Sequence, residues 1–429
     1  MPLIPDTARM APAGPLPDHP RIHWTTPEGE PASARWRSER GAPPPQRVVL
    51  ADDTTTADSA YRLACAGTAL LWRGDFQNAR HLLQAMTRRC DTVPARKQRK
   101  APPAAGPATP AEAFHRHRQA QAQRARTLGM LLIPVEADHT VALRRAPDVR
   151  QACTEAWGRA GAGDERAVVS LRELLSLTSA QEWRRVGVAV AALGGAPNNR
   201  VFPHYGVFSP VRGEYIDLVA QAPLPPGVAT STATPTAGEP TTETGRVFDI
   251  GTGTGVLSAV LARRGVRAIV ATDLDPRALA CAQANLQQLG VSDQVTLLQA
   301  DLFPPEKASL IVCNPPWLPA RASSPIERAV YDEDSRMLTG FLNGLAAHLA
   351  PQGEGWLILS DLAEHLGLRS REDLLALVHH AGLRVLGRLD AKPRHGKASD
   401  ASDPLHAARA AEVTSLWRLG VASAPVLRS

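Results

Sequence analysis

Cysteine is scarce in this sequence, and long apolar runs are missing. The 429 residues include five cysteines, none in the C-x-x-C spacing of a metal or redox site: Cys65, Cys90, Cys153, Cys281 and Cys313. A disulfide framework and a metal site are both poorly supported, so a reducing cytoplasm is the expected compartment. No run reaches the roughly 18 to 20 uncharged residues of a membrane helix, and the N-terminus lacks a signal-peptide pattern. We expect no membrane partner and no bound metal.

The positive charge of the chain is unevenly distributed. The whole sequence has 48 Lys and Arg against 42 Asp and Glu. Residues 1–130 hold 19 basic and 11 acidic residues, whereas residues 131–429 hold 29 and 31. A basic N-terminal third can contact RNA or an acidic partner, but it can also be an ordinary solvated surface.

The first half of the chain divides into arms, helices and linkers. Proline, alanine and arginine dominate residues 1–46, so a disordered arm is expected there. Helical spacing predicts a helix pair within 47–90, and a basic, proline-rich linker follows at 91–110. Residues 111–223 are predicted to form a mainly helical N-terminal or substrate domain that ends in a strand, a turn and a helix. A second linker, at 224–245, marks a boundary.

Short apolar strands alternate with helices from residue 246 to the end of the chain. RVFDIG, AIVATD, VTLLQAD, ASLIVCN and GWLILSD have the composition of buried strands, and amphipathic segments of 10 to 15 residues separate most of them. Such alternation is typical of βαβ units, in which helices cover a parallel sheet. We therefore predict an α/β domain over 246–429.

A glycine-rich loop follows the first of these strands. The strand ends at Asp249 and Ile250, and the loop Gly251-Thr252-Gly253-Thr254-Gly255 leads directly into a helix. Alternate glycines allow a sharp turn and close approach of a ligand, and the helix N-terminus offers unpaired N–H groups. Dinucleotide-binding loops have the spacing G-x-G-x-x-G, whereas here the third glycine comes one residue early, which disfavours a nicotinamide enzyme. A purely structural turn is the alternative.

Two carboxylates end the next two strands. Asp273 lies 22 residues after Gly251, where an acidic side chain can accept hydrogen bonds from the hydroxyls of a ribose. Asp275, before Pro276, has instead the position of a helix cap. Asp301 ends the following strand, at the sheet edge where ligands of open α/β folds bind, although a plain turn residue is the alternative.

The fourth strand leads into Asn314-Pro315-Pro316-Trp317. Successive prolines fix the backbone and remove two donors, so the Asn314 side-chain oxygen and the Pro315 carbonyl form a stiff pair of acceptors. Such a pair suits a planar –NH2 group, on which Trp317 can stack. A proline turn with a packed tryptophan is the alternative.

From about Phe202 to Leu419, the sequence resembles the class I S-adenosylmethionine-dependent methyltransferases with an NPPY-type motif. Within this class, the sequence resembles the HemK-type glutamine methyltransferases and other methyltransferase small domain proteins. The resemblance implies a Rossmann-like, mostly parallel sheet of seven strands with an antiparallel last hairpin.

The same resemblance implies a role for each singled-out residue. Asp249, Gly251, Thr252, Gly253 and Gly255 would lie at the methionine part of S-adenosylmethionine. Asp273 would bind the ribose, and Asp301 and Leu302 the adenine. Asn314, Pro315, Pro316 and Trp317 would clamp the target nitrogen, with Asn314 also counted among the cofactor contacts.

The expected function is methyl transfer to a planar nitrogen. The resemblance favours a glutamine side-chain amide of a protein. The alternative acceptor is an exocyclic amine of adenine or guanine in nucleic acid, with RNA favoured over DNA by the basic N-terminal region. A cofactor-binding scaffold without catalysis is a third hypothesis, against which the intact NPPW sequence argues. The sequence does not indicate an oligomeric state.

Overall fold

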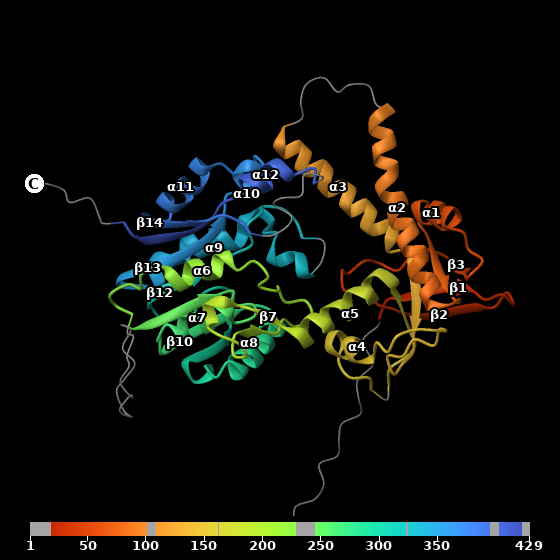
Figure 1. Ribbon diagram of the computed structural model, residues 1–429, viewed down its shortest axis with the longest axis horizontal. Helices are drawn as coiled ribbons and strands as arrows, with labels where there is room; N and C mark the ends of the chain where they lie inside the picture. The colour runs from red at the N-terminus through yellow and green to blue at the C-terminus, as the bar shows by residue number, and fades with distance from the viewer. Residues whose placement is uncertain are drawn as a thin grey trace, which may run out of the picture.

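Two β-sheets organise the chain, one in each half. The computed structural model describes residues 19–100, 109–161, 163–228, 245–322, 325–394 and 403–422. A six-stranded sheet lies in the N-terminal half (residues 19–186) and a seven-stranded sheet in the C-terminal half (residues 187–422). Figure 1 shows the two halves side by side, with helix α3 (Pro110–Leu128) reaching from one to the other.

The C-terminal sheet has the strand order β11-β10-β9-β12-β13-β15-β14. The first five strands in this order are parallel, and β15 is antiparallel to both of its neighbours. The strand bounds are β9 Arg246–Ile250, β10 Ala268–Asp273, β11 Val295–Gln299, β12 Ala308–Cys313, β13 Leu349–Ser360, β14 Leu383–Ala391 and β15 Thr414–Val421. This arrangement confirms the predicted seven-stranded, mostly parallel sheet with an antiparallel last hairpin.

Helices cover both faces of this sheet because its strands are apolar on both sides. Val247 of β9 packs in one cluster with helices α6, α7 and α8, whereas the next residue, Phe248, packs in another with α9 and α11. Successive side chains of a strand point to opposite faces, which explains this alternation. The helix bounds are α6 Glu214–Gln221, α7 Val256–Arg263, α8 Pro276–Gln288, α9 Arg336–His348, α10 Leu362–His365, α11 Arg371–His380 and α12 His406–Ala411.

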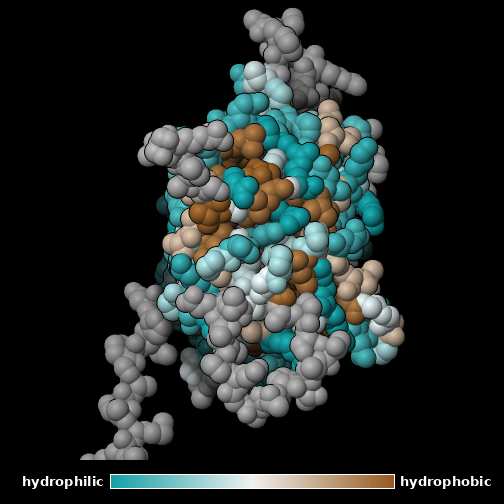
Figure 2. All heavy atoms as spheres, turned by 90° about the vertical axis from the view of Figure 1, so that its left-hand side faces the viewer, coloured by the Kyte–Doolittle hydropathy of each residue, from teal (hydrophilic) through white to brown (hydrophobic). Residues whose placement is uncertain are grey.

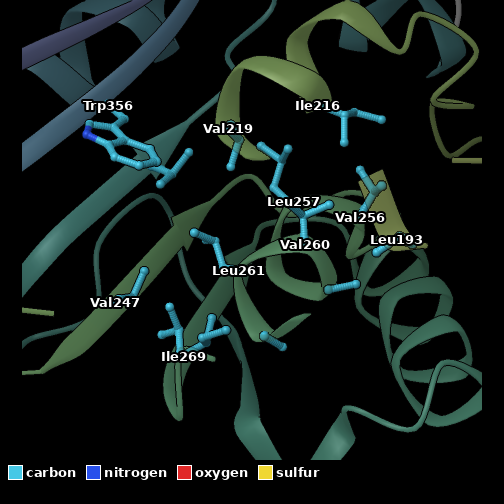
Figure 3. Packing of buried hydrophobic residues seen from close by; sticks show 14 of the residues in the cluster. Leu193, Ile216, Val219, Val247, Val256, Leu257, Val260, Leu261, Ile269 and Trp356 are labelled. Carbon is cyan, nitrogen blue, oxygen red and sulfur yellow. The ribbon is translucent and has the colours of Figure 1, made fainter. Parts of the chain in front are cut away.

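The cluster on the α7 face is drawn in Figure 3. Leu261 of α7 is fully buried there and points toward β9 and β10. Trp356 of β13 is also fully buried and belongs to the same cluster. The edge strand β14 leaves some apolar surface uncovered, since Val385 and Leu386 are more than a third exposed. Figure 2 shows apolar patches among hydrophilic surface on this side of the molecule.

The N-terminal sheet was not predicted. Its strand order is β1-β2-β6-β5-β4-β3, with parallel and antiparallel pairs mixed. The bounds are β1 Arg21–Thr25, β2 Pro31–Trp36, β3 Arg47–Ala51, β4 Thr68–Trp72, β5 Leu131–Val135 and β6 Ala167–Ser170; a separate two-stranded sheet pairs β7 Val188–Ala189 with β8 Arg200–Val201. The expectation of disorder over 1–46 is wrong for residues 21–36, and residues 1–18 lie outside the described part.

Two features of the sequence explain these errors: a strand whose partner is distant and a segment with an ambiguous pattern. β2 pairs with β6, more than 130 residues away, and such a partner leaves no mark on the local pattern. Thr68–Trp72 is a short apolar run that fits helical and strand spacing equally, so it was included in a helix pair. In the structure, helix α1 (Ala57–Cys65) ends before Gly67, which has a φ of 79°, and β4 follows.

Helices of the N-terminal half are longer than expected in one place. The bounds are α1 Ala57–Cys65, α2 Phe76–Lys100, α3 Pro110–Leu128, α4 Arg150–Trp157 and α5 Leu171–Val186. The linker predicted over 91–110 is wrong for residues 91–100, which continue α2, and residues 101–108 lie outside the described part. The 229–244 part of the predicted linker at 224–245 also lies outside it. Within 111–223, β5 and β6 accompany α3, α4, α5 and α6, and both strands belong to the N-terminal sheet.

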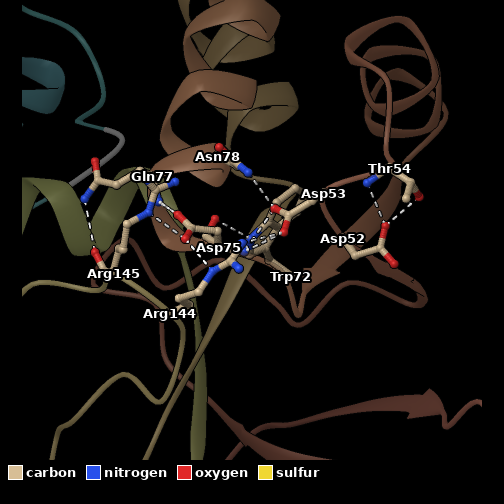
Figure 4. Close-up of polar contacts among 9 residues, drawn as sticks. All are labelled: Asp52, Asp53, Thr54, Trp72, Asp75, Gln77, Asn78, Arg144 and Arg145. Atoms are coloured by element: carbon tan, nitrogen blue, oxygen red, sulfur yellow. Dashed lines mark hydrogen bonds and ion pairs between the residues drawn. The ribbon is translucent and has the colours of Figure 1, made fainter.

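A buried carboxylate fixes the turn between β4 and α2. Asp75 accepts a hydrogen bond from the backbone N–H of Gln77 and ion-pairs with Arg144 and Arg145, at 2.9 and 2.7 Å (Figure 4). The hydrogen bond from Arg145 holds the pKa of Asp75 well below its usual range. Asp75 therefore stays ionised at neutral pH and ties α2 to the segment before α4.

We predict that Leu261→Ala lowers the free energy of unfolding by about 2–5 kcal/mol, because it leaves a cavity between α7 and the sheet. Urea titration measures the change. Leu375→Ala is the matched control, since Leu375 on α11 is 42% exposed and its loss should change stability by less than about 1 kcal/mol. Equal losses in the two variants would contradict the assigned core.

Candidate active site

The register of three parallel strands brings three loops to one level of the sheet edge. Ile250, the last residue of β9, pairs with Thr272 of β10 and with Cys313 of β12. The residues that follow, Gly251, Asp273 and Asn314, therefore leave the sheet side by side at its carboxyl edge. Ligands of open α/β sheets bind at this edge.

The three glycines of the loop have different roles. Gly251, Gly253 and Gly255 all have positive φ, at 72°, 56° and 79°. A Cβ on Gly251 would lie 2.6 Å from Cε of Met337, and one on Gly255 would lie 3.1 Å from Cβ of Ala282. A Cβ on Gly253 would meet nothing within 4 Å. The first and third glycines therefore allow close packing, and Gly253 borders open space that a ligand can enter.

The buried Asp249 side chain holds the glycine loop in place through hydrogen bonds. Its Oδ2 accepts hydrogen bonds from the Thr252 hydroxyl at 2.7 Å and from the Ser258 hydroxyl and backbone N–H at 2.6 and 3.1 Å. The side chain is buried, which raises its pKa, and its Oδ1 has no hydrogen-bond partner among the described residues. Asp249 and Thr252 thus shape the loop from inside the fold.

Asp273 lies at the loop with acceptor capacity to spare. Its Oδ2 accepts the Gly253 N–H at 3.0 Å, and its Oδ1 accepts the Asp275 N–H at 3.0 Å. A carboxylate offers about four lone-pair positions, so each oxygen can accept one more donor. Asp275 caps α8 through the Arg277 N–H, as its position before Pro276 predicted.

Sequence reasoning missed Leu274, which follows Asp273 and is 58% exposed. An apolar side chain this exposed at the carboxyl edge can pack on a flat ligand group. The only signal in the sequence was an apolar residue between two aspartates at a strand end.

Asp301 and Leu302 follow the carboxyl end of β11, at the rim of the candidate site. β11 ends at Gln299, two residues before the strand end predicted from the sequence. The Asp301 carboxylate is half exposed and ion-pairs with Arg336 at 2.6 Å. Leu302 has a φ of 76°, and its carbonyl accepts the Thr272 hydroxyl at 2.6 Å. This bond fastens the rim to β10, next to Asp273.

The Asn314-Pro315-Pro316-Trp317 loop is internally braced. The indole N–H of Trp317 donates to Oδ1 of Asn314 at 2.9 Å. Pro315 is buried, whereas Asn314, Pro316 and Trp317 are partly exposed. The Asn314 oxygen therefore accepts one donor from its own loop and keeps one lone pair for another.

An arginine from a distant segment covers Trp317. The Arg212 guanidinium lies 5.6 Å from the Trp317 ring centre and donates to the buried Glu412 at 3.0 Å. Glu412 also accepts the Ser360 hydroxyl at 2.7 Å. Arg212 lies just before α6, within the stretch that carries the sequence resemblance, but no local signal connects it with Glu412, 200 residues away.

The described residues contain no cluster of His, Cys, Asp and Glu that could hold a metal ion. None of the helices described is both long and apolar enough to cross a membrane.

Comparison with known proteins finds relatives of the C-terminal half of the chain. The model of the methyltransferase small domain family matches residues 236–371, which include the glycine loop, Asp273, Asp301 and Asn314. A release factor glutamine methyltransferase of Moorella thermoacetica is 38% identical over 26% of this chain and 41% of its own length. A tRNA1(Val) (adenine(37)-N6)-methyltransferase of Shewanella loihica is 31% identical over 39% of this chain and 77% of its own.

A solved structure described as a SAM-dependent methyltransferase from Geobacter sulfurreducens in complex with S-adenosyl-L-homocysteine aligns with 41% of this chain and 84% of its own. Its sequence identity is 18% and its TM-score 0.29. The chain belongs to the methyltransferase small domain family, whose enzymes use S-adenosylmethionine. The match with the Moorella thermoacetica protein spans less than half of the length of that protein.

The residues at the carboxyl edge fit this cofactor. Gly253 leaves a cradle that a Cβ would narrow, and the backbone amides of a helix N-terminus lie behind it. Asp273 has free acceptor positions for ribose hydroxyls, and Leu274 offers an apolar surface for the flat adenine. The pairing of Asp301 with Arg336 puts this carboxylate at the rim of the site.

We predict that Asp273→Asn weakens binding of S-adenosylmethionine by about 10-fold or more at neutral pH, since a hydrogen bond to a charged group contributes about 1.5–3 kcal/mol. Burial raises the pKa of Asp273 above its ordinary value. The affinity of the unchanged protein should therefore be complete at neutral pH and fall as the pH drops through this raised pKa. The asparagine variant should lack this pH dependence. Calorimetric titration between pH 4.5 and 8 measures both, and an Asp273→Asn protein that binds as tightly as the parent refutes the ribose role.

Proposed function

We propose that this protein is an S-adenosylmethionine-dependent N-methyltransferase whose acceptor is a planar –NH2 nitrogen. The observation that carries the proposal is the strand register that sets Asn314 beside the glycine loop and Asp273. The residues that we expect to bind the methyl donor and the acceptor therefore leave the sheet at the same level of its carboxyl edge. We further infer that the protein works in a reducing compartment such as the cytoplasm, because the five cysteines are free.

The acceptor loop supplies orientation. S-adenosylmethionine would supply a methyl group on a positively charged sulfur, so that the acceptor nitrogen can bond to the methyl carbon while the C–S bond breaks and the sulfur leaves as a neutral thioether. The free lone pair of the Asn314 oxygen and the Pro315 carbonyl would each accept one N–H of the acceptor. With both N–H bonds held, the nitrogen lone pair points out of the plane, toward the glycine loop. Positioning of this kind can contribute about 7–11 kcal/mol to catalysis, and the nitrogen proton leaves to water afterwards.

Two acceptors have the required chemistry. The glutamine side-chain amide, favoured by the sequence resemblance and by the name of one relative, is a planar –NH2 group. The exocyclic amine of adenine, named for the other relative, is another. One property of this chain favours the second candidate: its net positive charge comes from residues 88–128, and α3, which lies within that segment, packs against Leu318, the residue after the acceptor loop.

We predict that Asn314→Ala lowers kcat by about 100-fold or more, as removal of one preorganised hydrogen-bonding group does in other active sites. Binding of S-adenosylmethionine should change less than about threefold, because the glycine loop and Asp273 are untouched. Turnover assays and calorimetry give the two numbers. A parallel loss of cofactor binding would show that Asn314 does not act on the acceptor.

Trp317 has two separable contributions, stacking and the hydrogen bond to Asn314. We predict that Trp317→Ala raises the acceptor KM by about 3- to 10-fold, which corresponds to the 0.5–1.5 kcal/mol of an aromatic pair. Trp317→Phe keeps the ring but loses the N–H, so kcat should fall while KM stays within about threefold. Identical kinetic effects in the two variants would argue against separate roles.

A further inference from the structure

The net positive charge of the chain comes from one segment, which includes two helices. Residues 88–128, which include the second half of α2 and all of α3, contain ten Lys and Arg but only two acidic residues, Asp91 and Glu112. The rest of the chain has 38 basic and 40 acidic residues, so outside this segment the net charge is slightly negative. A surface with this excess attracts polyanions.

Some of these cations hold the fold together. Arg89 pairs with Asp58 at 2.7 Å, Arg124 with Asp91 at 2.9 Å and Arg118 with Glu327 at 3.3 Å. Arg88, Arg116 and Arg126 are exposed and have no acidic partner among the described residues. We call these three arginines, one on α2 and two on α3, the basic face; the two helices are in contact and are joined by the ion pair of Arg124 with Asp91.

One side of α3 is exposed along its length. His115, Gln119, Ala122 and Arg126 are all exposed and follow helical spacing of three or four residues, so they share one side. Arg116 and Arg126 are ten residues apart, which corresponds to about 15 Å along the axis. One small anion cannot contact both, whereas an extended polyanion can.

α3 packs against the segment that follows the acceptor loop. Phe114 on its buried side packs against Leu318 and Leu362, and the Arg118 guanidinium lies 3.9 Å from the Tyr331 ring centre. Tyr331 forms a β-bridge with Leu318, the residue after Trp317. α3 is thus anchored, through Phe114 and Arg118, beside the segment that follows Asn314-Pro315-Pro316-Trp317.

We propose that the basic face binds the phosphate backbone of single-stranded RNA and brings a base to the acceptor loop; this rests on the proposed function. The partly exposed Trp317 can stack on an unpaired base, and unpaired bases in RNA loops are accessible without opening a duplex. A base amine then meets the acceptor pair of Asn314 and Pro315.

The proposal is tested by measuring how tightly the full chain binds a fluorescein-labelled A20 RNA. Binding is monitored by fluorescence anisotropy between 50 and 200 mM KCl. Relative to the parent, R88Q/R116Q/R126Q should bind about 10-fold more weakly at 100 mM, and the salt slope should fall by about 2, since each single-strand phosphate contact contributes roughly 0.7. R73Q/R159Q/R384Q is the matched control, because it removes three exposed charges elsewhere and should bind within about twofold of the parent. Calorimetry with S-adenosylmethionine verifies that both variants remain folded.

Absence of RNA binding by the parent, or equal loss in both triple variants, overturns the basic face as an RNA site.

A second experiment separates this inference from the proposed function. Radiolabelled S-adenosylmethionine is incubated with the protein and with RNA and protein fractions of a lysate. Label in nuclease-sensitive material, reduced in R88Q/R116Q/R126Q but not in the control, supports the inference. Label only in protease-sensitive material overturns it and leaves an N-methyltransferase. Transfer to neither fraction, with cofactor binding intact, overturns both.

Discussion

The in-register pairing of β9 with β10 and β12 is the constraint on which the site depends. Because Ile250 lies level with Thr272 and Cys313, three loops that are distant in sequence begin at the same height. Among the described residues, no hydrogen bond joins Asn314 to the glycine loop or to Asp273, so the strand register is what places them together. A slip of one residue in either pairing would turn the loop residues to the opposite face of the sheet.

Each loop is then stiffened by bonds of its own. The buried Asp249 ties the glycine loop to the first turn of α7, and Asp273 ties it to β10. The prolines and the bond between Trp317 and Asn314 do the same for the acceptor loop. Groups held in this way need little reorganisation when substrates bind, which is the source of most electrostatic and orientational catalysis.

The sequence predicted what depends on local patterns. Alternating strands and helices, the glycine loop and the cap at Asp275 were recognisable because each follows from spacing within a few residues. The N-terminal sheet was missed because β2 and β6 pair across more than 130 residues. The contact between Arg212 and Glu412 was missed for the same reason. Asp301 was correctly placed near the sheet edge, but its pairing with Arg336 required the structure.

A crystal structure of the full chain with S-adenosylhomocysteine would test the central claim most directly. The account predicts that the ribose hydroxyls donate to Asp273, that the ligand runs past Gly253, and that its sulfur faces the Asn314 oxygen across open space. A ligand bound away from the glycine loop, or an Asn314 oxygen turned into the protein interior, would contradict it.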